Sequence, residues 1–211
     1  MKVRFILGAM CGMALALGSA SAQQTNVRVR GTIEQVDGPV LTIKSRAGET
    51  LKVKLIGDAK IAAVVKAKLS DIKPGSFVGA AALPEQGGGW KAEEVHIFPE
   101  SMRGTGEGDR AYDIGPKSSM TNGTVAPSPD GKSTMGGAVT SASGTQLTLD
   151  FQGGKKTINV TPDTKIVSML PGSTSDLKPG AGIMIPTATR QADGTLAAAR
   201  VTVGRDVAPP M

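Results

Sequence analysis

The sequence has little of what catalytic and metal centres are usually built from. Cys11 is its single cysteine, His96 is its single histidine, and aromatic residues make up 3% of the 211 residues. Cys11 lies in an N-terminal segment that we expect to be removed, so the mature chain is predicted to have no disulfide and no thiolate ligand. Zinc and copper sites usually combine several histidine or cysteine ligands. We therefore predict no bound metal and no cofactor.

The N-terminal segment has the pattern of a secretory signal peptide. Two cations precede an uncharged apolar stretch from Phe5 to Leu17, which is shorter than the roughly 20 residues that span a bilayer. Ala20-Ser21-Ala22 offers the small side chains that signal peptidase accepts, so residues 1–22 are predicted to be the signal peptide, with cleavage after Ala22. Lipid attachment at Cys11 is a lesser alternative, because Met10 departs from the small residues expected there. No later segment is apolar enough to span a membrane, and we expect a soluble periplasmic or secreted protein.

The charge distribution disfavours a nucleic-acid partner. Lys and Arg number 24 against 18 Asp and Glu, and two of the cations belong to the predicted signal. Binding of single-stranded nucleic acid relies on aromatic platforms beside a basic groove, whereas here the aromatics are few and the cations are scattered. The expected partner is an unknown protein, small molecule or ion in the cell envelope.

Two parts of the chain resemble each other, which indicates an internal duplication. Residues 70–75 read SDIKPG and residues 175–180 read SDLKPG, an offset of 105 positions. Leu41-Thr42-Ile43 and Leu147-Thr148-Leu149 are related by 106 positions. Offsets this constant are not expected by chance, so we predict two diverged copies of one small domain.

Each copy is predicted to be mainly β, because apolar and polar residues alternate with a period of two between turn sequences. In the first copy, the predicted strands cover residues 27–34, 40–44, 51–55, 77–83 and 91–98. Residues 61–69 are rich in Ala, Val and Lys and predict a short helix. The equivalent stretch of the second copy contains Pro171-Gly172-Ser173 and predicts a loop.

Three strands, a connector and two strands are the order of a five-stranded OB-type barrel. The sequence therefore predicts two tandem small five-stranded OB-like β-barrels joined by a Gly/Pro-rich linker. Another small β-barrel, or a two-layer sheet with the same strand order, is the alternative. The predicted boundaries are 23–98 for the first barrel, 99–136 for the linker, 137–204 for the second barrel and 205–211 for a C-terminal tail.

The linker is rich in Gly, Ser and Pro, and its Gly104-x-Gly106-x-Gly108 spacing is typical of a loop. Loops this long in compact proteins are either functional or disordered. Residues 121–125 alone have the character of a short strand, and residues around Lys132 to Gly137 make the start of the second copy uncertain.

The stretch Glu94 to Gly108, together with Ser119 to Val125 and the ending Val203 to Met211, resembles one family. Its members are uncharacterised exported proteobacterial proteins with OB-like domains of unknown function, often labelled "metal ABC transporter permease". The resemblance covers nearly the whole mature chain and implies an envelope location and a β-barrel, but no established activity. The permease label conflicts with a chain that lacks a predicted membrane span. Asp109 stands where relatives often carry a histidine, which argues against a metal site.

The residues do not assemble into a catalytic site. Serine hydrolases need a base beside the nucleophile, only His96 could serve, and no Gly-x-Ser-x-Gly elbow accompanies it. Glu93 and Glu94 are adjacent on a strand and point to opposite faces, so they cannot act as a carboxylate pair. His96 is opposite in phase to its apolar neighbours on that strand and is predicted to face solvent. We predict no catalytic residue and a protein that is not an enzyme.

Charged residues and glycines concentrate between His96 and Asp113, which is therefore the candidate interaction segment. Its candidate residues are His96, Arg103, Glu107, Asp109, Arg110 and Asp113. Bracing of the two barrels by this segment is an equal alternative, and Ca²⁺ binding by its carboxylates is a lesser one. The leading hypothesis is a non-catalytic periplasmic binding or interaction module. A metal-handling accessory protein associated with a transporter is the alternative, suggested by the family label.

Overall fold

The computed structural model describes residues 25–127, 139–141 and 144–207. The predicted signal peptide, with its cleavage site after Ala22, lies outside these residues. In the described part of the chain, a 13-stranded sheet and three short 3-10 turns account for the regular structure. This confirms the prediction of a mainly β protein. No helix in the same residues has the length and apolar character needed to cross a membrane.

The first three strands form an antiparallel meander, as their alternating sequences predict. They are β1 (Asn26–Asp37), β2 (Val40–Ser45) and β3 (Thr50–Lys66). Ile33, Leu41 and Val53 are buried, whereas the charged residues between them point outward. The two hairpin turns contain Gly38 and Gly48 at positive φ, a conformation that glycine adopts without a steric penalty.

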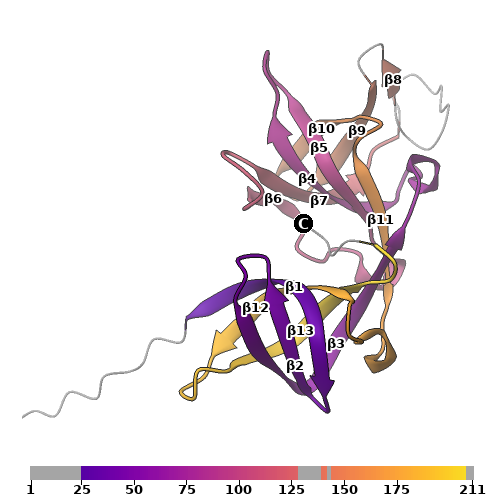
Figure 1. Cartoon of the computed structure of the whole chain (residues 1–211). Helices are drawn as coiled ribbons and strands as arrows, with labels where there is room; N and C mark the ends of the chain where they lie inside the picture. The colour runs from indigo at the N-terminus through magenta and orange to yellow at the C-terminus, as the bar shows by residue number, and fades with distance from the viewer. Residues whose placement is uncertain (1–24, 128–138, 142–143, 208–211) are drawn as a thin grey trace, which may run out of the picture.

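The last two strands, β12 (Gly182–Arg190) and β13 (Leu196–Gly204), close this meander into a five-stranded barrel. β13 pairs in parallel with β3, β12 pairs with β13, and β12 pairs antiparallel with β1 (Figure 1). The inward side chains form one core that includes Ile33, Leu41, Ile43, Val53, Ile183, Ile185, Leu196 and Val203. A closed barrel removes all exposed strand edges.

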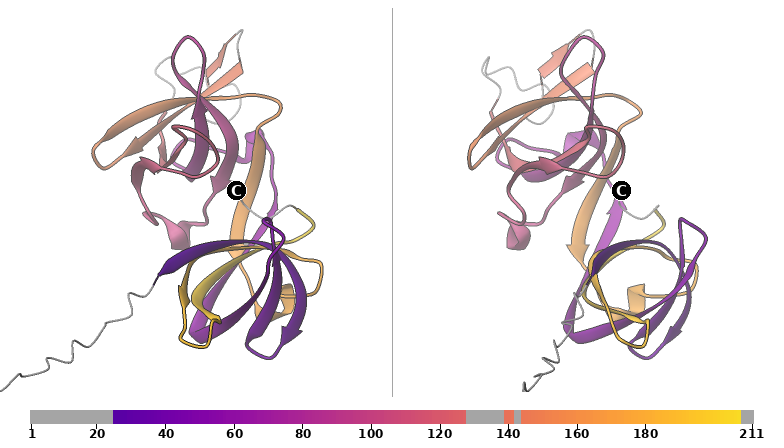
Figure 2. Two further views of the ribbon diagram at one scale, coloured as in Figure 1. Left: turned by 60° about the vertical axis from the view of Figure 1, so that its left-hand side comes forward. Right: turned by 90° about the vertical axis from the view of Figure 1, so that its left-hand side faces the viewer.

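This barrel combines strands from both predicted copies. β4 (Phe77–Pro84) and β5 (Trp90–Ile97) lie within the range 23–98 predicted for the first barrel, yet they pair with strands that follow them in the chain. Their partners are β7 (Ser119–Val125), β10 (Gly154–Val160) and β11 (Lys165–Pro171). The chain therefore leaves the barrel between β3 and β4 and returns to it between β11 and β12, as Figures 1 and 2 show.

We call the strands β4 to β11 the second strand group. Besides the strands already given, it contains β6 (Gly108–Ala111), β8 (Val139–Ser141) and β9 (Gly144–Phe151). β9 pairs with both β7 and β10, and β10 meets β5 at the pair Asn159–Lys91, so pairing runs around this group in a ring. Its register repeats that of the barrel. Val201 pairs with Ile61 in the barrel, and Val95, 106 positions before Val201, pairs with Ile166 in β11.

The connecting segments differ from the sequence prediction. The helix predicted over 61–69 is wrong, because β3 continues to Lys66 and only Leu69–Asp71 forms a 3-10 turn, η1. The loop predicted at its counterpart is also wrong, because β11 extends to Pro171. Residues 62–66 of β3 pair antiparallel with residues 167–171 of β11, and this pairing satisfies the backbone of both segments. Val64, Val167 and Met169 are buried where the two strands cross.

Part of the predicted linker 99–136 belongs to the sheet. It contains the 3-10 turn η2 (Glu100–Met102), β6 and β7, and β7 holds the position that β1 holds in the barrel. A Cβ on Gly31 of β1 would lie 2.1 Å from the carbonyl oxygen of Lys44, and a Cβ on Gly123 of β7 would lie 2.6 Å from that of Asp150. Both strands therefore need glycine at the same contact with the next strand. The insertion around 132–137 lies outside the described residues.

Candidate binding cleft between the barrel and the second strand group

A cleft with a volume of about 460 Å³ lies between the barrel and the second strand group. Its walls come from the outward faces of strands whose inward faces fill the two cores, as the period of two requires. On β13, Val201 is buried in the barrel core while Arg200 and Thr202 line the cleft. On β5, Val95 belongs to the core of the second strand group and His96 lines the cleft.

His96 is buried, with 6% of its surface exposed, so the prediction that it faces solvent is wrong. It does lie opposite in phase to Val95, as the sequence predicts, but the outward face of β5 is covered by neighbouring parts of the chain. Its Nε2 is 2.5 Å from a carboxylate oxygen of Glu94, which is 3% exposed. Its ring also meets the edge of Phe98, with 6.5 Å between ring centroids. Glu94 therefore fixes the orientation of the imidazole in a buried position.

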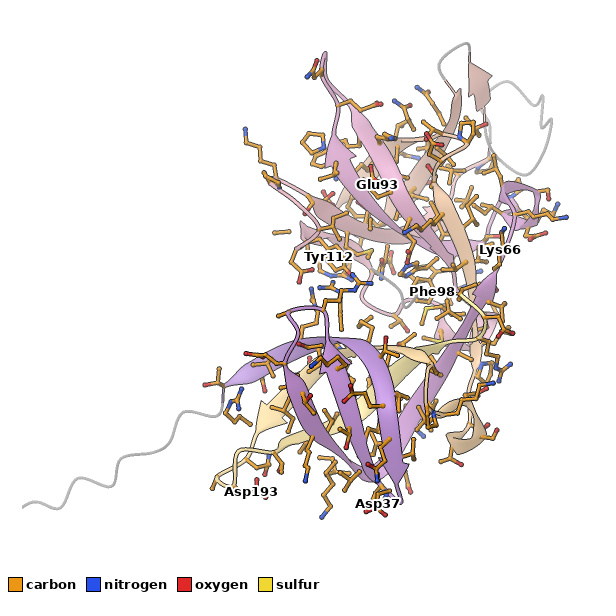
Figure 3. All side chains as sticks on the ribbon, viewed as in Figure 1. Asp37, Lys66, Glu93, Phe98, Tyr112 and Asp193 are labelled. Carbon is orange, nitrogen blue, oxygen red and sulfur yellow. The ribbon has the colours of Figure 1, made fainter. Side chains whose placement is uncertain are left out.

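Asp113 connects the second strand group to the barrel. Its carboxylate accepts hydrogen bonds from Arg28 at 2.6 Å and from two nitrogens of Arg30 at 2.8 Å each. Tyr112, which Figure 3 places on the side of the second strand group facing the barrel, lies under both guanidinium groups. The hydrogen bond from Arg30 lowers the pKa of Asp113 from 3.8 to about 2, with smaller contributions from the charges of both arginines. We call these four residues the clasp.

Arg103 and Glu107 make contacts within the second strand group and its turns. The guanidinium of Arg103 donates to Glu100 and to the carbonyl oxygen of Gly75, and the bond to Glu100 raises the pKa of Arg103 while lowering that of Glu100. Glu107 accepts a hydrogen bond of 2.9 Å from the backbone N–H of Gln152. Both residues therefore brace this part of the fold.

Asp109 is bonded to a buried lysine. Lys156 donates to both carboxylate oxygens of Asp109 at 3.1 Å and to the hydroxyl of Ser119 at 2.6 Å, and its ammonium lies 3.4 Å from the ring centroid of Trp90. A calcium site at Glu107, Asp109 and Asp113 is not formed, since the three carboxylates bind three different partners. In the described residues, no group of three or more His, Cys, Asp or Glu is arranged to hold a metal ion.

The structure thus divides the six residues of the candidate interaction segment. His96 and Arg110 line the cleft, and Arg110 donates to the carbonyl oxygen of Gly106 at 2.6 Å. Arg103, Glu107, Asp109 and Asp113 are held in contacts within the chain. This partition favours bracing for most of the segment and leaves only two of its residues available to a ligand.

Among the residues that the structure describes, the charged side chains that line the cleft are all cationic, and sequence reasoning missed three of the four. They are Arg28, Lys60, Arg110 and Arg200. Lys60 of β3 and Arg200 of β13 are direct neighbours in the parallel register. Both are exposed, and neither has an ion-pair or hydrogen-bond partner among the described residues. No sequence signal could have found this pair, since its members are 140 positions apart and meet only because β13 lies beside β3.

The apolar part of the cleft is rich in methionine. Within the described ranges, every methionine lines it: Met102, Met120, Met169 and Met184. These residues come from η2, β7, β11 and β12, so four separate elements converge on one volume. The other apolar residues of the lining are Phe98, Leu170, Ile61, Ala62, Val201 and two prolines. The cleft therefore combines an unbranched, adaptable apolar surface with cations at its edges.

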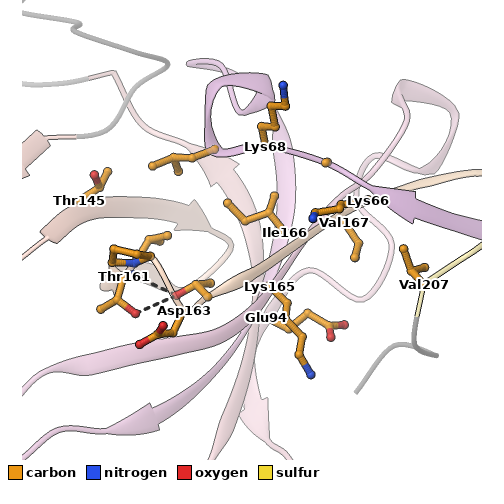
Figure 4. A pocket seen from close by; sticks show the side chains of 15 residues that line it. Lys66, Lys68, Glu94, Thr145, Thr161, Asp163, Lys165, Ile166, Val167 and Val207 are labelled. Carbon is orange, nitrogen blue, oxygen red and sulfur yellow. Dashed lines mark hydrogen bonds between the residues drawn. The ribbon is translucent and has the colours of Figure 1, made fainter.

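A second hollow, with a volume of about 780 Å³, lies near the junction of β10 and β11 (Figure 4). Ile166 lies at its centre, and Lys68 points away from it. The lining includes three lysines but also Glu94 and Asp163, so its charge has no single sign. This mixture gives no indication of a particular ligand.

Comparisons of the chain with protein-family models, with curated proteins and with solved structures find no match. Function must therefore be inferred from the cleft and its surroundings.

Proposed function

We propose that this protein is a non-catalytic binding module of the cell envelope and that its ligand binds in the cleft between the barrel and the second strand group. The single observation that carries this proposal is the lining of the cleft. Side chains from the barrel and from the second strand group surround about 460 Å³ with a mainly apolar surface and a few polar groups. Lys60 and Arg200 lie there without a partner in the described part of the chain. Ligand sites of proteins have this size and composition.

The proposal does not include catalysis. The one histidine, His96, is already bonded to Glu94, and no carboxylate in the described ranges of the chain lines the cleft beside it. A general base needs a substrate proton within reach and usually a second group that supplies the acid. Neither the hydrogen bonds nor the lining of the cleft provides such a pair.

Two OB-like barrels with exchanged last strands are the architecture that we propose for this module. The pairing order of the second strand group, with β10 parallel to β5 and β7 antiparallel to β4, parallels that of the barrel. The interpretation is supported by the repeated register and by the equivalent glycines Gly31 and Gly123. OB-like folds serve many binding functions, so the ligand is argued from the site and not from the fold.

An envelope location is supported by the N-terminal sequence and by the family resemblance. Sequencing the N-terminus of the mature protein tests it, since cleavage after Ala22 would leave Gln23 as the first residue. A chain that stays full-length in the cytoplasmic fraction would contradict it.

A metal-handling accessory is the second candidate function, and one observation favours it. Thioether and imidazole ligands select soft ions such as Cu(I), and the described methionines line the same cleft as His96. Orientation of a ligating histidine by a carboxylate is also a common feature of metal sites. The cations at the edge of the cleft argue against this candidate function, because they repel a metal ion. Titration with Ag(I), a stable substitute for Cu(I), would support this candidate if one ion bound and binding was lost in M169L.

The binding proposal itself is tested by filling the cleft. Ala62 lies on β3 and lines the cleft, so Ala62→Trp places an indole in the volume, whereas Ala47→Trp adds the same group at an exposed turn. NMR of ¹³C-methyl methionine then reports the cleft directly, with each signal assigned by a Met→Leu variant. Compounds from a small-molecule library should shift these signals in the wild type and in A47W, but not in A62W. Shifts that persist in A62W, or a library without any effect, would contradict the proposal.

A further inference from the structure

We infer that the ligand of the cleft is a small organic anion with an apolar body, namely a carboxylate or phosphate headgroup on one aliphatic or aromatic tail. This inference rests on the proposed function and adds the chemical class of the ligand. It follows from the position of the cations, from a lining whose described residues include no carboxylate, and from the apolar surface of the cleft.

Lys60 and Arg200 form the centre of the anion site. The two residues are neighbours on adjacent parallel strands, and strands of a sheet are about 4.8 Å apart. Like charges on neighbouring strand positions repel each other and lower stability. No described carboxylate accepts a hydrogen bond from either residue, so a bound anion would remove a repulsion that the protein alone leaves in place.

Further cations face the same volume. Arg110 comes from β6 of the second strand group, and Arg28 comes from β1 of the barrel. Asp113, which binds Arg28, is shared with Arg30 in the clasp, so a single negative charge faces two positive charges there. A cleft lined by charges of one sign with low-dielectric walls concentrates the field and attracts an ion of opposite sign.

The apolar surface excludes a small inorganic anion as the sole occupant. The four methionines and Phe98 lie among the cations, and Met120 and Met169 are themselves buried. Burying an apolar tail against them removes apolar surface from water and so stabilises the complex. A volume of about 460 Å³ suits one such molecule. It is too small for a polymer, and the aromatic platforms on which nucleic-acid bases stack are few, with only Phe98 and Tyr112 in the lining.

A series of ligands with one tail and different headgroups tests this class. The probes are octanoate, octyl phosphate, octan-1-ol and octylammonium, with acetate and inorganic phosphate as anions that lack the tail. Each is titrated into the mature protein below its micelle concentration, with calorimetry for affinity and the methionine methyl signals for location. At least one of octanoate and octyl phosphate should bind about tenfold or more tightly than octanol, because charge-assisted hydrogen bonds are the strong ones. Octylammonium, acetate and inorganic phosphate should bind weakest. The two octyl anions together identify which headgroup is preferred.

Charge-neutral variants locate the anion. Lys60→Gln with Arg200→Gln should reduce binding of the preferred anion about tenfold or more and leave binding of octanol nearly unchanged. Lys44→Gln with Lys52→Gln is the matched control, since it removes the same charge from exposed positions of the barrel that do not line the cleft. Both double variants are first checked for native circular dichroism.

The outcomes separate this inference from the proposed function. If octanol or octylammonium shifts the methionine signals as strongly as the anions do, the cleft is a binding site but the anion class is refuted. If no probe shifts these signals while the library screen succeeds, the class is refuted in the same way. If the control variant loses as much affinity as K60Q/R200Q, general attraction by the net charge explains the binding and the anion site is refuted.

Discussion

The clasp makes a quantitative prediction, because one carboxylate holds two guanidinium groups across the boundary between the barrel and the second strand group. Replacing Asp113 by Asn keeps the shape of the side chain and removes its charge. Arg28 and Arg30 then face each other without an anion, although both keep their contact with Tyr112. We expect Asp113→Asn to lower the free energy of unfolding while leaving both cores intact.

The magnitude follows from the pKa of Asp113. A fall from 3.8 to about 2 corresponds to at most about 2.4 kcal/mol, since one pKa unit is about 1.4 kcal/mol. The side chain of Asp113 is 49% exposed, so solvent screening reduces this contribution to about 1 kcal/mol. Arg30 is 14% exposed and loses its anionic partner, which adds roughly another 0.5–1 kcal/mol. The expected loss at pH 7 is therefore about 1.5–2 kcal/mol.

The pH dependence gives an independent check. The folded-state pKa of Asp113 lies below its unfolded value of 3.8, so the stabilisation is complete above about pH 5 and is lost as the pH falls towards 2. Roughly half of it should be gone at pH 3. The Asp113→Asn variant has no charge at this position at any pH. The difference in unfolding free energy between wild type and variant should therefore shrink over the same pH range.

Urea unfolding followed by circular dichroism at pH 7, 5 and 3 measures these differences. Asp37→Asn is the matched control, because Asp37 is exposed in the β1–β2 hairpin and lies far from the clasp (Figure 3). Equal losses in the two variants would refute the role of the clasp. A difference between wild type and D113N that stays constant from pH 7 to pH 3 would refute the electrostatic explanation.

Three further predictions concern the fold. Gly123→Ala would place a Cβ 2.6 Å from the carbonyl oxygen of Asp150 and should destabilise the protein by about 2–4 kcal/mol in urea unfolding. Gly38→Ala is the control: nothing lies within 4 Å of its Cβ, so it should cost only about 1 kcal/mol for its positive φ. Equal costs would contradict the close contact. Because the barrel takes strands from both ends of the chain, the two strand groups should unfold in a single calorimetric transition whose van't Hoff and calorimetric enthalpies agree; two separate transitions would contradict this coupling. Lys156→Met should shift the fluorescence emission of Trp90, the single tryptophan, and cost about 2–3 kcal/mol, because it leaves the ring without its cation and Asp109 without its cationic partner. Unchanged emission would argue against the contact.

The sequence itself determined the strands and the orientation of their side chains. Alternation with a period of two placed β1, β2, β4 and β5 close to their observed ranges. It also placed His96 and Val95 on opposite faces of β5. These properties are local, because adjacent residues of a strand must point to opposite faces whatever the strand pairs with.

Tertiary structure alone decided which strands pair. The two copies have the same register, so β4 and β5 have a backbone and an apolar face suited to either group, and local sequence cannot distinguish the two pairings. The crossing of β3 and β11, where Ala62 to Lys66 pair with Val167 to Pro171, leads each chain segment into the opposite strand group. Considered without its partner, the crossing segment of β3 predicts a helix and that of β11 predicts a loop.

The candidate site depends entirely on this pairing. His96 is buried because the outward face of β5 lies against other parts of the chain, and Lys60 meets Arg200 because β13 lies beside β3. The period of two tells which side chains leave a strand on the same face, but not whether that face meets water or protein. The sequence alone determined which residues could line a surface. The pairing of distant strands, which depends on contacts far apart in the chain, decided that these surfaces face each other across one cationic, methionine-lined cleft.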